Sequence, residues 1–124
     1  MPKLFDLVVL DQPVQAPGVV YSDVEFNEVL SRADRLVINA VVSEVSGTAP
    51  TLTISVEGGP DHRHWVVIDA GAPPLSSQPL SAGPPGLLAC SFVGDQPACT
   101  RLKVTLAGAS AKARIKIHVT GRVG

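Results

Sequence analysis

The densest group of side chains that could bind a metal ion is Asp61-His62-Arg63-His64. Its two histidines, two positions apart, point the same way from a strand or turn, and imidazole is a common ligand of zinc. A third ligand at a useful spacing is missing, because His118 is far away along the chain. We interpret the cluster as a polar turn before Trp65, which we expect to anchor the core. The sequence therefore predicts no metal site and no cofactor.

Residues that would support catalysis form no recognisable set. Ser76, Ser77 and Ser81 stand in a loop-like context and lack the G-x-S-x-G pattern of an activated serine. The carboxylates show no spacing that singles out an acid–base pair. Gly58-Gly59-Pro60 has no phosphate-binding lysine and opens no helix. We expect a protein that is not an enzyme.

Cationic side chains occupy alternate positions of two segments near the C-terminus. They are Arg101 and Lys103 in one segment, and Arg114, Lys116 and His118 in the other. If the two segments form one hairpin, all five lie on one face, where like charges oppose each other. Two interpretations remain open, an acidic protein partner or an ordinary solvated face. The net charge of −1 and the lack of an aromatic stacking platform argue against nucleic acid.

The chain has two cysteines, Cys90 and Cys99. A hairpin that turned at Gly94-Asp95 would place them opposite each other, so a cross-strand disulfide is one interpretation. Two reduced thiols acting as small buried hydrophobes is the other. The spacing does not match a CxxC redox or zinc motif.

Strands must position all of these residues, because apolar side chains recur at every second position of four segments. Such alternation puts one face of a sheet on a core and the other in water. We predict two hairpins, which turn at Ser46–Pro50 and at Gly108–Ala111. The apolar positions are Leu36, Ile38, Ala40 and Val42, then Leu52, Ile54 and Val56, then Leu102, Val104 and Leu106, then Ile115, Ile117 and Val119.

The complete pattern predicts about eight strands in an all-β, antiparallel two-sheet sandwich that is jelly-roll-like. For 20–28 a strand is expected, with a helix over 23–33 as the alternative. Residues 71–86 contain five prolines and are expected to form a long extended loop without regular strand. The predicted strands are 4–10, 20–28, 36–45, 51–57, 64–68, 87–93, 99–106 and 112–120.

Length and composition agree with one domain over residues 1–124. Apolar residues make up 45% of the chain but aromatic residues only 4%, so the core should be aliphatic. Met1–Leu10 is too short and too polar for the core of a signal peptide, and no stretch approaches the roughly 20 apolar residues that cross a bilayer. Residues 1–20 read either as an edge strand or as an arm that lies on a neighbouring molecule.

Several motifs resemble small β-sandwich structural proteins of tailed phages. The similarity rests on Ser46-Gly47-Thr48-Ala49-Pro50-Thr51-Leu52, on Pro60-Asp61 followed by Trp65, and on Arg101-Leu102-Lys103-Val104-Thr105-Leu106-Ala107-Gly108. It covers residues 33–120 and contains no catalytic signature. Gly58-Gly59 and the proline-rich loop depart from the pattern.

The resemblance implies a capsid decoration, or cement, protein on the virion surface, assembled in the host cytoplasm as a trimer or dimer. Its partner would be the major capsid protein, with no direct contact to membrane or nucleic acid. A tail or baseplate protein and a carbohydrate-binding module are the alternatives; the second is disfavoured by the few aromatic residues and by the expected burial of Trp65. The residues expected to contact the partner are Leu4, Phe5, Val14, Pro17, Arg101, Lys103, Arg114, Lys116 and His118.

Overall fold

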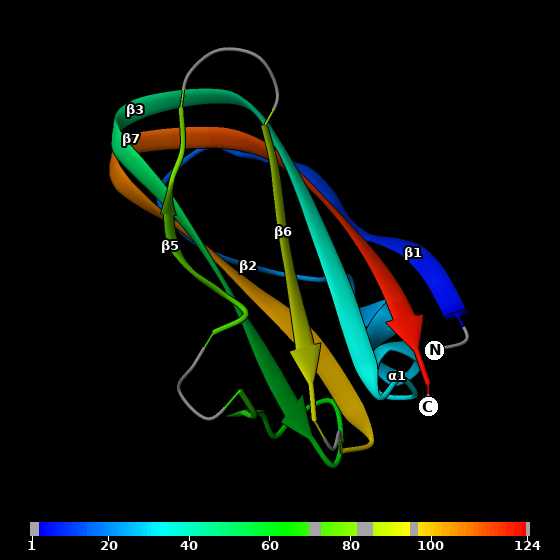
Figure 1. Ribbon diagram of the computed structural model, residues 1–124. Coiled ribbons are helices and arrows are strands. Elements are labelled where there is room, and N and C mark those ends of the chain that lie inside the picture. Colours follow the sequence, from blue (N-terminus) through cyan, green and yellow to red (C-terminus); the bar gives the residue numbers. More distant parts are fainter. Residues whose placement is uncertain (1–2, 70–72, 82–85, 95–96, 124) are drawn as a thin grey trace.

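Two very long strands organise the computed structural model, which describes residues 3–69, 73–81, 86–94 and 97–123. Strand β3 (Arg35–Gly59) pairs antiparallel with β7 (Cys99–Arg122), and their register runs from Arg35↔Arg122 to Gly59↔Cys99. Figure 1 shows the two strands side by side over their whole length, bending together at one end of the molecule. The β3–β7 ribbon therefore belongs to both halves of the fold.

The bend is built from residues with left-handed backbone conformations. The φ angles of Gly47 and Gly108 are 109° and 122°, and the register shifts several times between Ser43 and Thr51. A Cβ atom added to Gly47 would lie 2.6 Å from the Cα atom of Ala111, so the two strands touch at this point. Glycine is required there both for its conformation and for this close approach.

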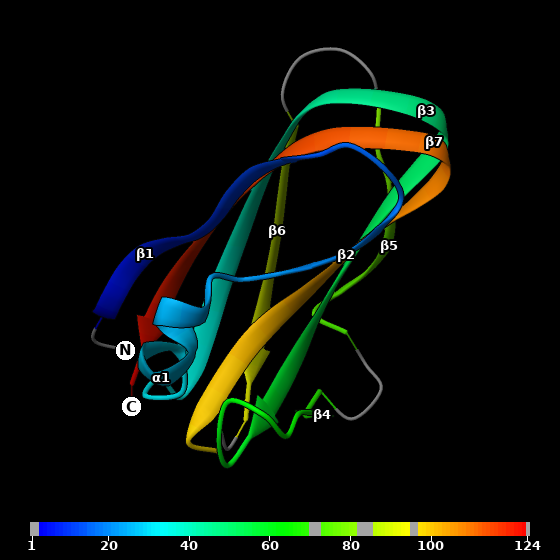
Figure 2. The same cartoon turned by 180° about the vertical axis from the view of Figure 1, so that it is seen from behind.

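The bend folds the ribbon into two layers around one core (Figures 1 and 2). The first layer contains the first half of β3, the second half of β7, β1 (Lys3–Val14) and β6 (Gly86–Val93). The second layer contains the second half of β3, the first half of β7, β2 (Gly18–Tyr21), β4 (Val66–Val67) and β5 (Leu75–Pro79). The predicted class, an all-β antiparallel sandwich, is confirmed.

The predicted inward faces are also confirmed, since every apolar position singled out by the alternation is buried. Leu36 and Ile38 of the first layer and Leu52 and Ile54 of the second have no exposed surface. Burying a side chain of this kind stabilises the fold by about 1.5–3 kcal/mol. The core is almost entirely aliphatic, and Phe92 is the one aromatic residue in its buried cluster among those the structure describes.

The predicted hairpins are wrong. Ser46–Pro50 and Gly108–Ala111 are not turns between paired strands but the bends of β3 and β7. The segments 36–45 and 51–57 therefore pair with β7 and not with each other. A short segment with glycine and positive φ can reverse a hairpin or bend a continuous strand, and local sequence does not distinguish the two.

Two further segments differ from the main prediction. The 3-10 helix η1 (Val24–Phe26) and the helix α1 (Asn27–Leu30) replace the strand expected over 20–28, so the helical alternative is confirmed. The helical spacing puts Leu30 inside and leaves Val24 exposed. Strand β5 lies within the expected loop 71–86, at an edge of the sheet where Pro79 is tolerated. Two pairs of predicted strands merge, the strand over 20–28 is lost to the helices, and β2 and β5 are added, which gives seven strands among the described residues.

The N-terminal segment is an edge strand and not a free arm over its described part. Strand β1 pairs with β7 from Lys3↔Arg122 to Val14↔Ala113, and a register shift after Val8 lets both Val9 and Leu10 point into the core. Neither helix of the described residues is long and apolar enough to cross a membrane.

Candidate functional site

A stack of two aromatic rings around one guanidinium group stands on the outer face of the second layer. The Cζ atom of Arg101 lies 3.8 Å from the centre of the Tyr21 ring and 4.2 Å from that of the Trp65 ring. The residues come from three elements: β7 carries Arg101, Tyr21 ends β2, and Trp65 directly precedes β4. We call these three residues with Glu57 the aromatic stack.

Glu57 holds the guanidinium in place. Arg101 and Glu57 are register partners on β7 and β3. Nε of Arg101 donates to Oε1 of Glu57 at 2.8 Å, and Nη2 forms an ion pair with the same oxygen at 2.8 Å. The two side chains are only 21% and 11% exposed. In such a partly dry position a charge-assisted contact is stronger than at an open surface. The ion pair therefore fixes the side chain against which both rings lie.

The turn before Trp65 is ordered by Asp61. Its carboxylate accepts the backbone N–H groups of Arg63 and His64, and it also contacts Nδ1 of His64. These contacts, led by the Arg63 amide, lower the pKa of Asp61 to about 2. The indole Nε1 of Trp65 in turn donates to the carbonyl oxygen of His62 at 3.2 Å. The cluster thus acts as a structured turn, as predicted, and no group of three or more possible metal ligands gathers among the described residues.

Hydroxyl groups and one lysine extend the polar surface beside the stack. Thr53 and Ser55 alternate with the buried residues of β3, and Lys103 and Thr105 do the same on β7, so all four face outward. Lys103 is the register partner of Tyr21 and has no ion-pair partner among the described residues. Flat rings next to hydrogen-bonding groups can bind a ligand that has both apolar faces and hydroxyls.

The predicted single basic face does not exist, because the bend of β7 separates its members. Arg101 and Lys103 belong to the second layer, whereas Arg114, Lys116 and His118 lie on the outer face of the first. Arg114 pairs with Asp11 at 2.9 Å, and His118 contacts Asp6, both on β1. Much of the charge in the first layer is therefore balanced within the molecule.

The four N-terminal residues expected to contact a partner have different environments. Val14 is buried in the core and Phe5 packs against Gly121, which makes both structural. Leu4 is 46% exposed, and Pro17 is exposed between β1 and β2. The structure does not gather them into one surface.

The predicted opposition of Cys90 and Cys99 is wrong, and both cysteines are free. Cys90 lies on β6 opposite Ile38, whereas Cys99 opens β7 opposite Gly59 in the other layer. Burial raises the pKa of the Cys90 thiol to about 11 and also raises that of Cys99. The interpretation as small, poorly reactive hydrophobes fits these positions.

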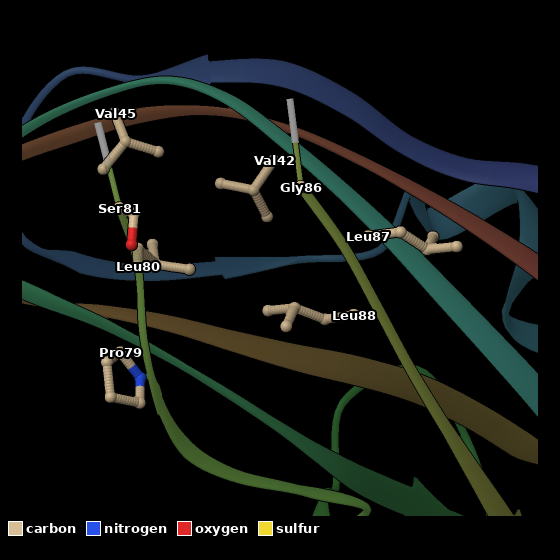
Figure 3. A pocket seen from close by; sticks show the side chains of 8 residues that line it. All are labelled: Val42, Val45, Pro79, Leu80, Ser81, Gly86, Leu87 and Leu88. Carbon is tan, nitrogen blue, oxygen red and sulfur yellow. The ribbon is translucent and has the colours of Figure 1, made fainter. Parts of the chain in front are cut away.

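A hollow opens between the end of β5 and the start of β6, with a volume of about 170 Å³ (Figure 3). Its walls are aliphatic, with Val42, Leu80 and Leu88 turned toward it and Ser81 as the one hydroxyl side chain. It offers apolar contact but few directed hydrogen bonds. The aromatic stack is therefore the better candidate for recognising a polar ligand.

Comparison with known proteins gives one fold-level finding. No family model matches the chain, and no curated protein matches it in sequence. Among solved structures it is similar to the CBM22-1 xylan-binding domain of Xyn10C from Paenibacillus barcinonensis, with a TM-score of 0.60 and 12% sequence identity. The match covers 94% of this chain and 96% of that domain. At this identity the likeness establishes the shared β-sandwich fold.

Sequence reasoning named only Arg101 among the members of the aromatic stack as a candidate site residue. Trp65 was expected in the core, but it is half-buried and packs outside the core cluster. Glu57 and Arg101 are 44 positions apart and Tyr21 is 80 from Arg101, so only the register of β2, β7 and β3 brings them together. Glu57 and Arg101 each alternate with buried residues along their strands and therefore face outward, and this alternation was the sequence signal that could have pointed to them.

Proposed function

We propose that this protein is a non-catalytic carbohydrate-binding module that recognises a polysaccharide through the outer face of its second layer. The observation that carries the proposal is the aromatic stack: Tyr21 and Trp65 held at the surface by one guanidinium. Sugar rings have apolar C–H faces and a rim of hydroxyls, and they pack on aromatic side chains while hydrogen-bonding to neighbouring polar groups.

The residues of the stack have distinct roles in this proposal. Tyr21 is 40% exposed and presents a ring surface for packing, while Trp65 provides a second ring against the same guanidinium. Glu57 occupies Nε and Nη2 of Arg101, so Nη1 remains to donate to a ligand hydroxyl. Lys103, half-buried and the register partner of Tyr21, adds an ammonium donor beside it.

The fold adds support, because the similar Xyn10C domain is described as xylan-binding. Xylan is therefore the first polysaccharide to test, within a panel that includes a β-glucan and a mannan. The virion role implied by the phage resemblance stays a prediction. The residues expected to contact a capsid are spread over both layers, so no described surface favours that role over this one.

Affinity electrophoresis in gels containing each soluble polysaccharide tests the proposal. We expect the wild-type protein to be retarded by at least one polysaccharide, and Tyr21→Ala and Trp65→Ala to weaken binding at least about tenfold, which is ~1.4 kcal/mol. Lys116→Ala, a change of an exposed lysine on the other layer, is the control and should bind like the wild type. Wild-type mobility that no polysaccharide alters, or full binding by Tyr21→Ala, would overturn the proposal.

A further inference from the structure

We propose that β6 pairs edge to edge with the β6 strand of a second copy of this chain, joining the first layers of two molecules into one continuous sheet. The inference is independent of carbohydrate binding, which uses the other layer. It rests on the free edge of β6, on its lack of protective residues, and on the apolar surface around it.

One side of β6 is unpaired. The strand is hydrogen-bonded to β3 from Arg35↔Val93 to Val42↔Gly86, and no strand of the described part of the chain pairs with its other side. In an antiparallel sheet, half of the backbone N–H and C=O groups of an edge strand point away from its only neighbour. Strand β6 therefore presents a row of donors and acceptors over eight residues.

The sequence of β6 lacks the residues with which natural edge strands prevent association. Gly86–Val93 contains neither a charged residue nor a proline. The opposite edge of the same layer, β1, carries Asp6, Asp11 and Pro13. Charges and prolines are the usual means of blocking an edge, so one edge of this layer is protected and the other is open.

Apolar surface borders the open edge. Leu87 and Val93, near the two ends of β6, are 65% and 66% exposed, and Val41, the register partner of Leu87, is 38% exposed. On the inner side, the aliphatic hollow opens beside the start of β6 (Figure 3). Association through this edge would remove apolar surface from water as well as satisfy backbone groups.

A second copy fits this edge because an antiparallel strand is complementary to itself across a two-fold axis. A register centred on Cys90 places Leu87 of one molecule opposite Val93 of the other on the outer face, with Ala89 opposite Ser91. All of these side chains are uncharged, so pairing two copies brings no like charges together. The product is an eight-stranded sheet in the order β1-β7-β3-β6-β6-β3-β7-β1.

Sedimentation velocity from about 1 μM to about 300 μM, a range that spans common homodimer affinities, tests the pairing. We expect the mass of the wild-type protein to rise from 12.9 kDa toward twice that value. Ala89→Lys should remain at 12.9 kDa, because a lysine on an edge strand opposes pairing and the two lysines would be diagonal neighbours across the axis, each opposite Ser91. Val8→Lys, at a position on β1 that is also exposed, is the matched control and should associate like the wild type.

Hydrogen exchange of the wild-type protein locates the contact without any substitution. We expect the β6 amides to exchange at least about tenfold more slowly at the high concentration, while the β1 amides remain unchanged. A wild-type mass of 12.9 kDa over the whole range would overturn the proposal. So would association that Val8→Lys abolishes and Ala89→Lys does not, or slowed exchange in β1 in place of β6.

Discussion

Replacing Arg101 by methionine should destabilise the protein strongly, because Glu57 would lose the only cation that contacts it among the described residues. Two donors of Arg101 reach Glu57 at 2.8 Å, and Glu57 is only 11% exposed. Hydrogen bonds to a charged group contribute about 1.5–3 kcal/mol, and each cation–π contact about 0.5–1 kcal/mol. Methionine keeps most of the apolar stem. We therefore expect Arg101→Met to lower the free energy of unfolding by about 3 kcal/mol.

Urea denaturation at pH 7 measures this loss as a lower midpoint with an unchanged slope. The matched control is Lys103→Met, on the same strand and face but without an ion pair among the described residues, which should cost less than about 0.5 kcal/mol. The double variant Glu57→Gln/Arg101→Met should recover at least about 1 kcal/mol, because the uncompensated charge is removed. An Arg101→Met loss no larger than that of Lys103→Met would refute the reasoning.

Three further predictions concern the bend, a thiol and the turn. Gly47→Ala should lower the free energy of unfolding by about 2 kcal/mol in urea denaturation, because the φ of Gly47 is 109° and the new Cβ would meet the Ala111 backbone. Gly86→Ala, with open space around it, is the control and should change little. Equal effects of the two changes would contradict the close contact of β3 and β7 at the bend. The pKa of the Cys90 thiol is raised from 9.0 to about 11, so at pH 8 native Cys90 should have about 100-fold less thiolate than in the unfolded chain. A thiol reagent should therefore label Cys90 about 100-fold more slowly in the native protein than in urea. Equal labelling rates with and without urea would refute the burial of Cys90. Asp61→Ala should lower the melting temperature above pH 4. The difference should shrink as the pH falls from 4 to 2 and vanish below pH 2, because the stability that comes from a lowered carboxyl pKa is lost on protonation. A difference that did not shrink between pH 4 and 2 would contradict this origin.

Local patterns were enough to predict which side chains face the core but not how the strands connect. The alternation identified Leu36, Ile54 and Ile117 as inward positions, because successive side chains of a strand point to opposite faces whatever the strand pairs with. The bend was not predictable, because Glu44, Ala49 and Ser110 adopt positive φ values although none is glycine. Those conformations are imposed by the neighbouring strand of the ribbon.

The candidate site was harder to predict because its residues meet only through the sheet register. Arg101 appeared as one of several cations, and its partner Glu57 as one of several acids, until the pairing of β3 and β7 put them side by side. Trp65 was expected inside because large aromatic residues usually anchor cores. The fully aliphatic interior of the second layer leaves it outside, against Arg101.

The most direct test of carbohydrate binding at the aromatic stack is intrinsic fluorescence, because Trp65 is the single tryptophan of the chain. Titration with soluble oligosaccharides of the polysaccharide that retards the protein should change the emission of Trp65 in a saturable way. Tyr21→Ala should weaken the response and Lys116→Ala should not. Binding by calorimetry without any change in Trp65 emission would place the site elsewhere, and no binding at all would contradict the proposed function.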